Sequence, residues 1–289
     1  MKHIVGFSGG IDSQACARWV LNRFPAEDVI LLNSNAGGNE HPLTEAFVKE
    51  YSEKVHPVIR VFAKAEDVER PYDRRRIEEK IGTEAELTFD DMAASIGIFP
   101  NNRNQFCTTY LKLAPQRRWH RLNTPDGDFE RYTGVRRDES RRRAGTPWRE
   151  WDDYFDCYVN NPLADWTKQM AFDNVRQFNE PINPLYSLGF SRVGCAPCVN
   201  ANKEDIEQWA ERFPEVIDKV RAWEKKVGRT FFVPLIPNIT PREINGKLQK
   251  FNWIDEVVEW SRTDRGGRQF NILKGLERPA CESKFGLCE

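Results

Sequence analysis

The chain has 289 residues, of which 39% are hydrophobic and 30% are charged, and its formal net charge is -1. This length suffices for one large domain or two smaller ones, and the composition excludes an intrinsically disordered chain. The balanced charge also excludes a surface that is basic all over, so any contact with nucleic acid must come from a local patch.

The N-terminal part alternates between predicted strands, at 3–7, 29–32 and 58–62, and predicted helices, at 12–24 and 42–55. Such alternation predicts βαβ crossovers and a parallel α/β sheet. The start of the chain leads directly into a strand rather than a signal peptide, and the longest apolar runs are too short to cross a bilayer. Both features favour a cytoplasmic protein.

The rest of the chain is divided by its composition. Residues 66–97 are charged and mostly helical in pattern, a strand is expected at 131–135, and a clear helix is expected at 203–226. Beyond Thr146 the periodicity weakens and Trp, Tyr, Asn and Pro cluster. We therefore expect one domain over residues 1–150 and a smaller, mostly helical, cysteine-bearing region over residues 151–289.

The most informative motif lies between the first strand and the first helix and reads Ser8-Gly9-Gly10-Ile11-Asp12-Ser13. Adjacent glycines let backbone N–H groups face outward, and the helix N-terminus adds partial positive charge, so the loop suits a phosphate. Ser8 and Ser13 add hydroxyl groups, while Asp12 can cap the helix or organise Mg²⁺. An ordinary turn before a capped helix is the alternative that these residues alone leave open.

This hexapeptide resembles the Ser-Gly-Gly-x-Asp-Ser signature of the PP-loop ATP pyrophosphatases. The resemblance implies a Rossmann-like sheet of the adenine nucleotide alpha hydrolase type, with helices on both faces. It also implies that ATP is split between its α and β phosphates, which yields an adenylated acceptor and pyrophosphate. In that family the end of the second strand lies near the adenine, which implies adenine contacts for Asn33 and Ser34.

An arginine-rich segment resembles the phosphoadenosine phosphosulfate (PAPS) reductase branch of these enzymes. Residues 133–142 read Thr-Gly-Val-Arg-Arg-Asp-Glu-Ser-Arg-Arg, close to the Gly-Ile-Arg-x-x-Glu-Ser-x-x-Arg of that branch. Gly134 and Arg136 are therefore expected at the nucleotide, and Arg136 and Arg142 can hold phosphate bidentately. Arg141 and Arg143 are expected on a solvated surface.

A second segment of the same branch is a cysteine followed by Leu-Lys-x-x-Pro, which here is Cys107 with Leu111-Lys112 and Pro115. The resemblance makes Lys112 a candidate contact for the nucleotide or the substrate.

Seven cysteines without a secretion signal favour metal or sulfur chemistry over a disulfide framework. Cys195 and Cys198 form a Cys-x-x-Cys turn, Cys107 is the natural third ligand, and the C-terminal sequence contains Cys281 and Cys288. Four thiolates fit zinc or a 4Fe–4S cluster, and the resemblance favours the cluster. Cys288 is the expected fourth ligand and Cys281 the expected carrier of persulfide sulfur, although the ligand role can equally fall to Cys281.

The two remaining cysteines, Cys16 and Cys157, are expected to be small buried hydrophobic residues.

The C-terminal sequence lacks the Glu-Cys-Gly-Leu-His motif with which PAPS and adenylylsulfate reductases attack the sulfate sulfur. With its intact ATP loop, the chain instead resembles the DndC- and SspD-type enzymes of DNA phosphorothioation. The resemblance implies that a DNA phosphate attacks the α-phosphorus of ATP and that sulfur from a cysteine desulfurase then displaces AMP. Partner proteins of a modification complex are expected to supply DNA affinity, and the implied catalytic residues are Asp12, Lys112, Arg136 and Cys281.

Three other functions stay open at this stage: a PAPS or adenylylsulfate reductase, a tRNA-thiolating enzyme, and a non-enzymatic iron–sulfur redox or DNA-binding regulator. The unbroken ATP loop argues against the regulator. Basic segments at 117–121 and 137–143 can follow a nucleic-acid backbone or can equally be solvated surface.

Overall fold

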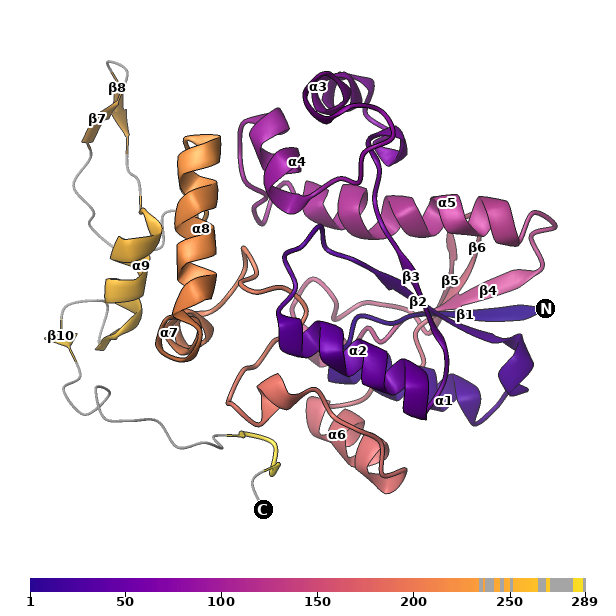
Figure 1. Ribbon diagram of the computed structural model, residues 1–289. Helices are drawn as coiled ribbons and strands as arrows, with labels where there is room; N and C mark the ends of the chain where they lie inside the picture. The colour runs from indigo at the N-terminus through magenta and orange to yellow at the C-terminus, as the bar shows by residue number, and fades with distance from the viewer. Residues whose placement is uncertain are drawn as a thin grey trace.

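The protein is described by a computed structural model that covers residues 1–233, 236, 242–244, 247–249, 252–264, 269–270 and 283–287. Six strands form its main sheet (Figure 1). In chain order they are β1 (Lys2–Gly6), β2 (Val29–Ser34), β3 (Val58–Val61), β4 (Phe129–Tyr132), β5 (Arg149–Asp152) and β6 (Cys157–Asn160). Their spatial order is β3-β2-β1-β4-β6-β5, and only the β5–β6 pair is antiparallel. The expected α/β fold is confirmed.

Helices cover both faces of this sheet, as Figure 1 shows. On one face lie α1 (Ile11–Leu21), α2 (Pro42–Lys54) and α6 (Lys168–Gln177), and on the other lies α5 (Ala114–Asn123). The other helices of the described residues are α3 (Pro71–Ile81), α4 (Phe89–Ile96), α7 (Lys203–Arg212), α8 (Pro214–Val227) and α9 (Ile254–Ser261). Single helical turns occur at Ala26–Asp28, Ala65–Asp67, Arg137–Glu139 and Pro184–Tyr186, a π-helix at Thr108–Leu113, and short strand pairs at β7 (Arg242–Ile244) with β8 (Lys247–Gln249) and β9 (Thr263–Asp264) with β10 (Gln269–Phe270).

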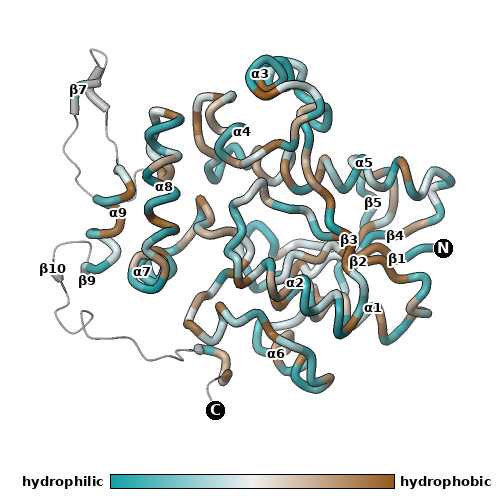
Figure 2. The backbone as a smooth tube through the Cα atoms, viewed as in Figure 1, coloured by the Kyte–Doolittle hydropathy of each residue, from teal (hydrophilic) through white to brown (hydrophobic). Residues whose placement is uncertain are grey.

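Alternate residues of the central strands feed two hydrophobic clusters. Val5 and Leu31 belong to the larger cluster, which includes residues of α1 and α2, whereas Ile4 and Leu32 belong to a smaller cluster against which Trp119 of α5 packs. Neighbouring residues separate in this way because side chains of a strand point alternately to its two faces. Figure 2 shows the resulting apolar centre of the sheet, which explains why both faces carry helices.

Two cysteines belong to these clusters rather than to the candidate site. Cys16 lies in the larger cluster and Cys157 in the smaller one, and both are buried, as expected.

The prediction of one continuous helix at 203–226 is wrong, because the structure has two helices there, α7 and α8. Phe213 separates them with φ of -140°, outside the helical region. Pro214 then begins α8, where its missing N–H group costs nothing. The strand expected at 131–135 ends at Tyr132, which leaves Gly134 and Arg136 in the loop at the carboxyl end of β4.

The main sheet runs across the composition change near residue 150. β5 begins at Arg149, and β6, which lies beyond it in sequence, pairs with β4. Helix α6 also packs against α1. The division into 1–150 and 151–289 therefore stays an expectation from composition. No helix in the described ranges combines the length and the apolar character needed to cross a membrane.

Candidate nucleotide and cysteine site

A cavity of about 590 Å³ lies at the carboxyl ends of β1 and β4. Its lining comes from residues in the segments 6–13, 134–143 and 186–198, together with Lys112 and Lys168. This is the edge at which open α/β sheets usually bind ligands. The structure therefore brings the glycine motif, the arginine segment and the Cys-x-x-Cys turn to one cavity.

The glycine loop (Ser8–Ser13) is shaped by bonds within itself. The Ser13 hydroxyl donates to the Gly10 carbonyl at 2.8 Å and accepts from the Ser8 amide at 3.0 Å. Gly9 has φ of +77°, and a Cβ there would lie 3.1 Å from the Thr44 side chain. These constraints explain why the loop needs glycine at this position.

Helix α1 begins directly after the loop, with Gly10 as its N-cap. No side chain caps this helix, so the expectation that Asp12 can act as a cap is wrong. The amides of Asp12 and Ser13 have no acceptor among the residues that the structure describes, as the first turn of a helix requires. They remain able to bind an anion.

The arginine segment packs directly on this helix start. A Cβ at Gly134 would lie 2.3 Å from the Asp12 carbonyl oxygen, so only glycine fits there. Arg136 is buried, and its Nε donates to Asp12 Oδ1 at 2.7 Å. Burial raises the pKa of the Asp12 carboxyl group, and the Arg136 charge opposes that shift. Arg136 also pairs with Asp138, so its guanidinium group is held in a fixed position beside the helix start.

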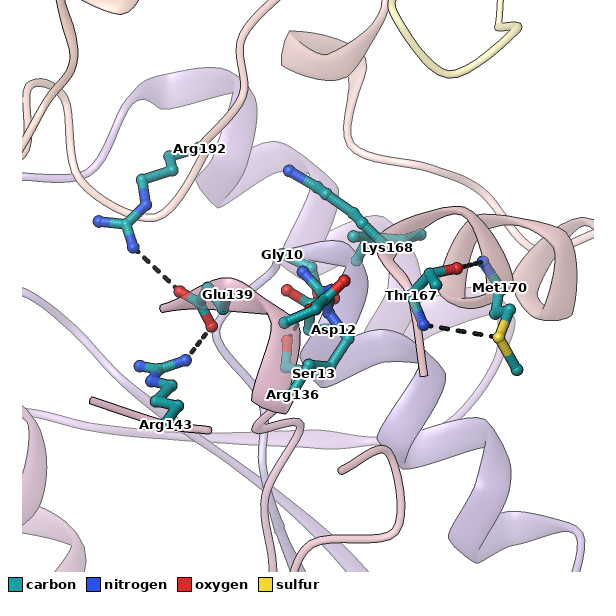
Figure 3. A network of polar contacts seen from close by, with 12 residues as sticks. Gly10, Asp12, Ser13, Arg136, Glu139, Arg143, Thr167, Lys168, Met170 and Arg192 are labelled. Carbon is teal, nitrogen blue, oxygen red and sulfur yellow. Dashed lines mark hydrogen bonds and ion pairs between the residues drawn. The ribbon is translucent and has the colours of Figure 1, made fainter. Parts of the chain in front are cut away.

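Two residues that line the cavity, Lys168 and Tyr186, are not indicated by any sequence motif. Lys168 begins α6, and its Nζ donates to the Ser191 carbonyl at 2.5 Å. Burial lowers the pKa of Lys168, and the Asp12 carboxylate opposes that shift. The Tyr186 hydroxyl accepts from the Ile11 amide at 3.0 Å, which occupies one N–H group of the helix start. Figure 3 shows Lys168 beside Asp12 and Gly10.

Two buried side chains join the glycine loop to the segment that precedes the cysteine turn. Asn183 Nδ2 donates to the Gly9 carbonyl at 3.2 Å and to Thr44 Oγ1 at 3.1 Å. Thr44 Oγ1 in turn donates to the Val193 carbonyl at 2.7 Å. Asn183 and Thr44 are each only 1% exposed, so water does not compete for these bonds.

The cysteine turn (Gly194–Cys198) is held by Asn39. The Asn39 carbonyl accepts from the Ala196 amide at 2.8 Å, and its side-chain Nδ2 donates to the Pro197 carbonyl at 3.2 Å. A single residue before α2 thus binds both residues that separate the two cysteines, and a sequence pattern alone cannot indicate that support.

Lys112 connects the cysteines to the rest of the cavity. Its Nζ lies 3.4 Å from Cys195 Sγ, and the charge of Cys195, with Cys107 and Cys198, raises the pKa of Lys112. Burial raises the pKa of Cys107 to about 11, and Cys195 contributes to that shift, so the two thiols lie in one electrostatic environment. None of the three cysteines forms a disulfide.

A metal site is not complete within the described residues. No group of three or more His, Cys, Asp or Glu side chains there is arranged around a single ion. The expected fourth ligand Cys288 and the alternative Cys281 both lie outside the residues that the structure describes.

Asn33 and Ser34 do not line the cavity, although the resemblance implied adenine contacts for them. Asn33 Nδ2 donates to the Phe7 carbonyl at 2.8 Å, and Ser34 Oγ donates to the Lys112 carbonyl at 2.7 Å. In this structure they tie the end of β2 to its neighbours and position Lys112.

The arginines that follow the 3₁₀ turn are placed differently from expectation. Arg142 is exposed and does not line the cavity, whereas Arg143 does line it. Arg143 forms an ion pair with Glu139, which also pairs with Arg192 at 2.9 Å (Figure 3). Phosphate binding by Arg142 therefore stays a prediction.

Comparison with known proteins places this site in a family. The sequence profile of the phosphoadenosine phosphosulfate reductase domain matches residues 2–201. The chain belongs to this family, and the matched range contains every lining segment of the cavity.

Individual proteins of known sequence or structure share between 18% and 37% of their aligned residues with this chain. A protein of Escherichia phage 186, described as an uncharacterized 37.8 kDa protein in the gpa 5′ region, is 29% identical and aligns over 99% of this chain and 96% of its own length. The adenosine 5′-phosphosulfate reductase of Allochromatium vinosum is 37% identical over 47% of this chain, and the match covers about half, 51%, of that reductase. Among solved structures, PAPS reductase from Candida auris in complex with phosphate has 18% identity and a TM-score of 0.45 over 68% of this chain and 81% of its own.

Proposed function

We propose that this protein is an ATP pyrophosphatase that adenylates a backbone phosphate of DNA and so prepares it for sulfur insertion. The observation that carries the proposal is the glycine loop, because Ser8, Gly10, Asp12 and Ser13 line the same cavity as Arg136 and Cys195. Phosphate binding at the helix start and a thiol-bearing wall in one cavity suit a reaction that joins nucleotide cleavage to sulfur chemistry.

The chain's own residues have separate tasks in this reaction. The loop amides, Arg136 and Lys168 bind the triphosphate and stabilise the charge that develops as pyrophosphate leaves. Asp12 has one carboxylate oxygen on Arg136 and is 28% exposed, so its remaining oxygen suits Mg²⁺ carried by the nucleotide.

The bond changes occur in two steps. An oxygen of the DNA phosphate attacks the α-phosphorus of ATP, the bond to the β-phosphate oxygen breaks, and pyrophosphate leaves. Hydrosulfide, supplied by a cysteine desulfurase and a thiol reductant, then attacks the DNA phosphorus. AMP leaves and carries away the oxygen, a proton is released, and sulfur replaces oxygen on DNA.

A 4Fe–4S cluster fits the donor set at the cysteine end of the cavity. Cys107, Cys195 and Cys198 are soft thiol donors free of disulfides, and the nearby Lys112 compensates the negative charge of thiolates. With a fourth cysteine from Cys281 or Cys288, these residues would hold the cluster, which would supply redox-active iron and sulfide. Cys281 otherwise serves as the persulfide carrier.

Product analysis tests the proposal. Anaerobically purified protein is incubated with ATP, Mg²⁺, a DNA duplex, a thiol reductant and a hydrosulfide source, and the nucleotide products are separated. We expect AMP and pyrophosphate in equal amounts, dependent on DNA, and their loss in Asp12→Asn. Formation of ADP and phosphate, or no cleavage with DNA and hydrosulfide both present, contradicts adenylation.

Sulfonucleotide reduction is the second candidate, because the named reductase of Allochromatium vinosum is 37% identical over the aligned part of the chain. Incubation with PAPS or adenosine 5′-phosphosulfate and a thiol reductant separates the two functions. Release of sulfite would establish the reductase and remove the need for ATP.

A further inference from the structure

The two basic stretches of the chain differ in what faces their arginines. On α5, Arg117 pairs with Glu69, and Arg118 pairs with Asp67 at 2.5 Å and donates to the Phe62 carbonyl. Most of the positive charge on this helix is therefore compensated by the acidic segment 66–69. A backbone phosphate would have to displace these carboxylates before it could bind.

The second stretch follows Arg136 and lies at the cavity. Arg141 and Arg142 are exposed and have no acidic partner within the described ranges. Arg143 and Arg192 share the single carboxylate of Glu139, so this part of the cavity wall keeps an excess positive charge (Figure 3). Arg143 and Arg192 also line the cavity.

We propose that Arg141, Arg142, Arg143 and Arg192 form an arginine rim that docks the sugar-phosphate backbone of DNA at the mouth of the nucleotide cavity. The choice of DNA rests on the proposed function. Guanidinium groups bind phosphate oxygens in pairs, and backbone contacts of this kind set the position of a duplex without reading its sequence.

The position of the rim explains how an acceptor reaches the nucleotide. Arg141 and Arg142 are free to hold one part of the backbone outside, while the adjacent Arg143 reaches the cavity wall. The backbone is continuous, so a phosphate next to those held by Arg141 and Arg142 comes close to the glycine loop. Arg192 contacts the backbone from the other side of Glu139.

The test compares two double variants of the full chain. Binding of a fluorescent DNA duplex is followed by anisotropy over a series of KCl concentrations, with a non-hydrolysable ATP analogue present. R141A/R142A removes two rim charges, so the slope of log K against log salt should fall by about two, with at least about a tenfold loss of affinity at low salt. The matched control R117A/R118A removes the two arginines of α5 that pair with Glu69 and Asp67, and it should leave slope and affinity unchanged.

Each contrary result has a definite meaning. An unchanged slope in R141A/R142A, or an equal loss in the α5 control, overturns the rim. Tighter binding of an RNA duplex, or of anionic phospholipid vesicles, with the same dependence on Arg141 and Arg142 overturns DNA as its partner. Affinity for the ATP analogue, measured on the same samples, separates the two claims. If the parent chain binds the ATP analogue and R141A/R142A keeps the parent affinity for DNA, only the rim is overturned. If the parent chain does not bind the ATP analogue, the proposed function is overturned.

Discussion

The glycine loop and the cysteine turn lie on one cavity, yet they are held in different ways. The loop is shaped by its own residues, because the Ser13 hydroxyl bonds to Ser8 and Gly10. The turn is held from a distance, by Asn39 before α2 and through the Thr44 bond to Val193. A phosphate loop can therefore be identified from a hexapeptide, whereas the position of a thiol pair depends on contacts spread along the chain.

The largest expected effect comes from adding one methyl group beside the loop. In Gly134→Ala the new Cβ would lie 2.3 Å from the Asp12 carbonyl oxygen, so the arginine segment and α1 must separate. We expect at least about a 100-fold loss of pyrophosphate release, the scale of an ångström-sized misplacement. Calorimetry with an ATP analogue should show a parallel loss of affinity.

The cysteine turn supplies the control for that experiment. A Cβ at Gly194 meets no atom within 4 Å, so Gly194→Ala should bind the ATP analogue as the parent chain does. Equal losses in the two variants would show that the loop is not more tightly constrained than the turn.

The next effect concerns the charge that faces the loop. Arg136→Lys keeps one positive charge but loses the planar group that contacts both Asp12 and Asp138. We expect about a tenfold to 100-fold lower rate of pyrophosphate release, less than the roughly 100- to 1,000-fold cost of removing a charge-stabilising donor altogether, because lysine keeps the charge. In contrast, Arg137→Lys changes a residue that pairs with Asp165 and does not line the cavity, and should keep the parent rate. Equal rates for the two variants would exclude Arg136 from the site.

Removing the hydrogen bonds that connect the glycine loop to the cysteine turn should have a moderate effect. Thr44→Val removes the hydroxyl that joins Asn183 to the Val193 carbonyl, and buried groups left unpaired cost about 1–3 kcal/mol of unfolding free energy. Denaturant unfolding checks this value, and alkylation of Cys195 should become faster. If Thr44→Val and Asn183→Ala have additive effects when combined, the two residues do not act as one connection.

The smallest effect is a pH dependence. Burial lowers the pKa of Lys168, so its charge contributes fully to ATP binding below that pKa and is lost as pH rises through it, at a lower pH than for an exposed lysine. We expect affinity to fall about fivefold over this alkaline range, the scale of a partly screened charge contact. Lys168→Arg, which stays charged, should flatten the curve. An unchanged curve would mean that Lys168 does not bind the nucleotide.

The same comparison explains what the sequence could reveal. The sheet, the glycine loop and the clustering of Arg136, Lys112 and Cys195 follow from local motifs that end at one edge of a parallel sheet. Lys168 and Tyr186 could not be found in this way, because they are ordinary residues in a segment of weak periodicity.

These two residues reach the loop only through tertiary packing. The Tyr186 hydroxyl bonds to the Ile11 amide although 175 residues separate them. Asn33 and Ser34 donate to neighbouring backbone carbonyls in this structure and do not line the cavity, so the adenine contacts that the resemblance implies for them stay a prediction.

The account depends most on the claim that the glycine loop and the cysteine turn form one site. Protein freed of bound metal is treated with iodoacetamide with and without an ATP analogue, and the modification of each cysteine is followed by mass spectrometry. We predict that the nucleotide slows modification of Cys195 and Cys198, that this protection is absent in Gly134→Ala, and that the buried Cys16 and Cys157 react slowly throughout. If Cys195 and Cys198 are alkylated at the same rates with saturating nucleotide as without it, a shared site is contradicted.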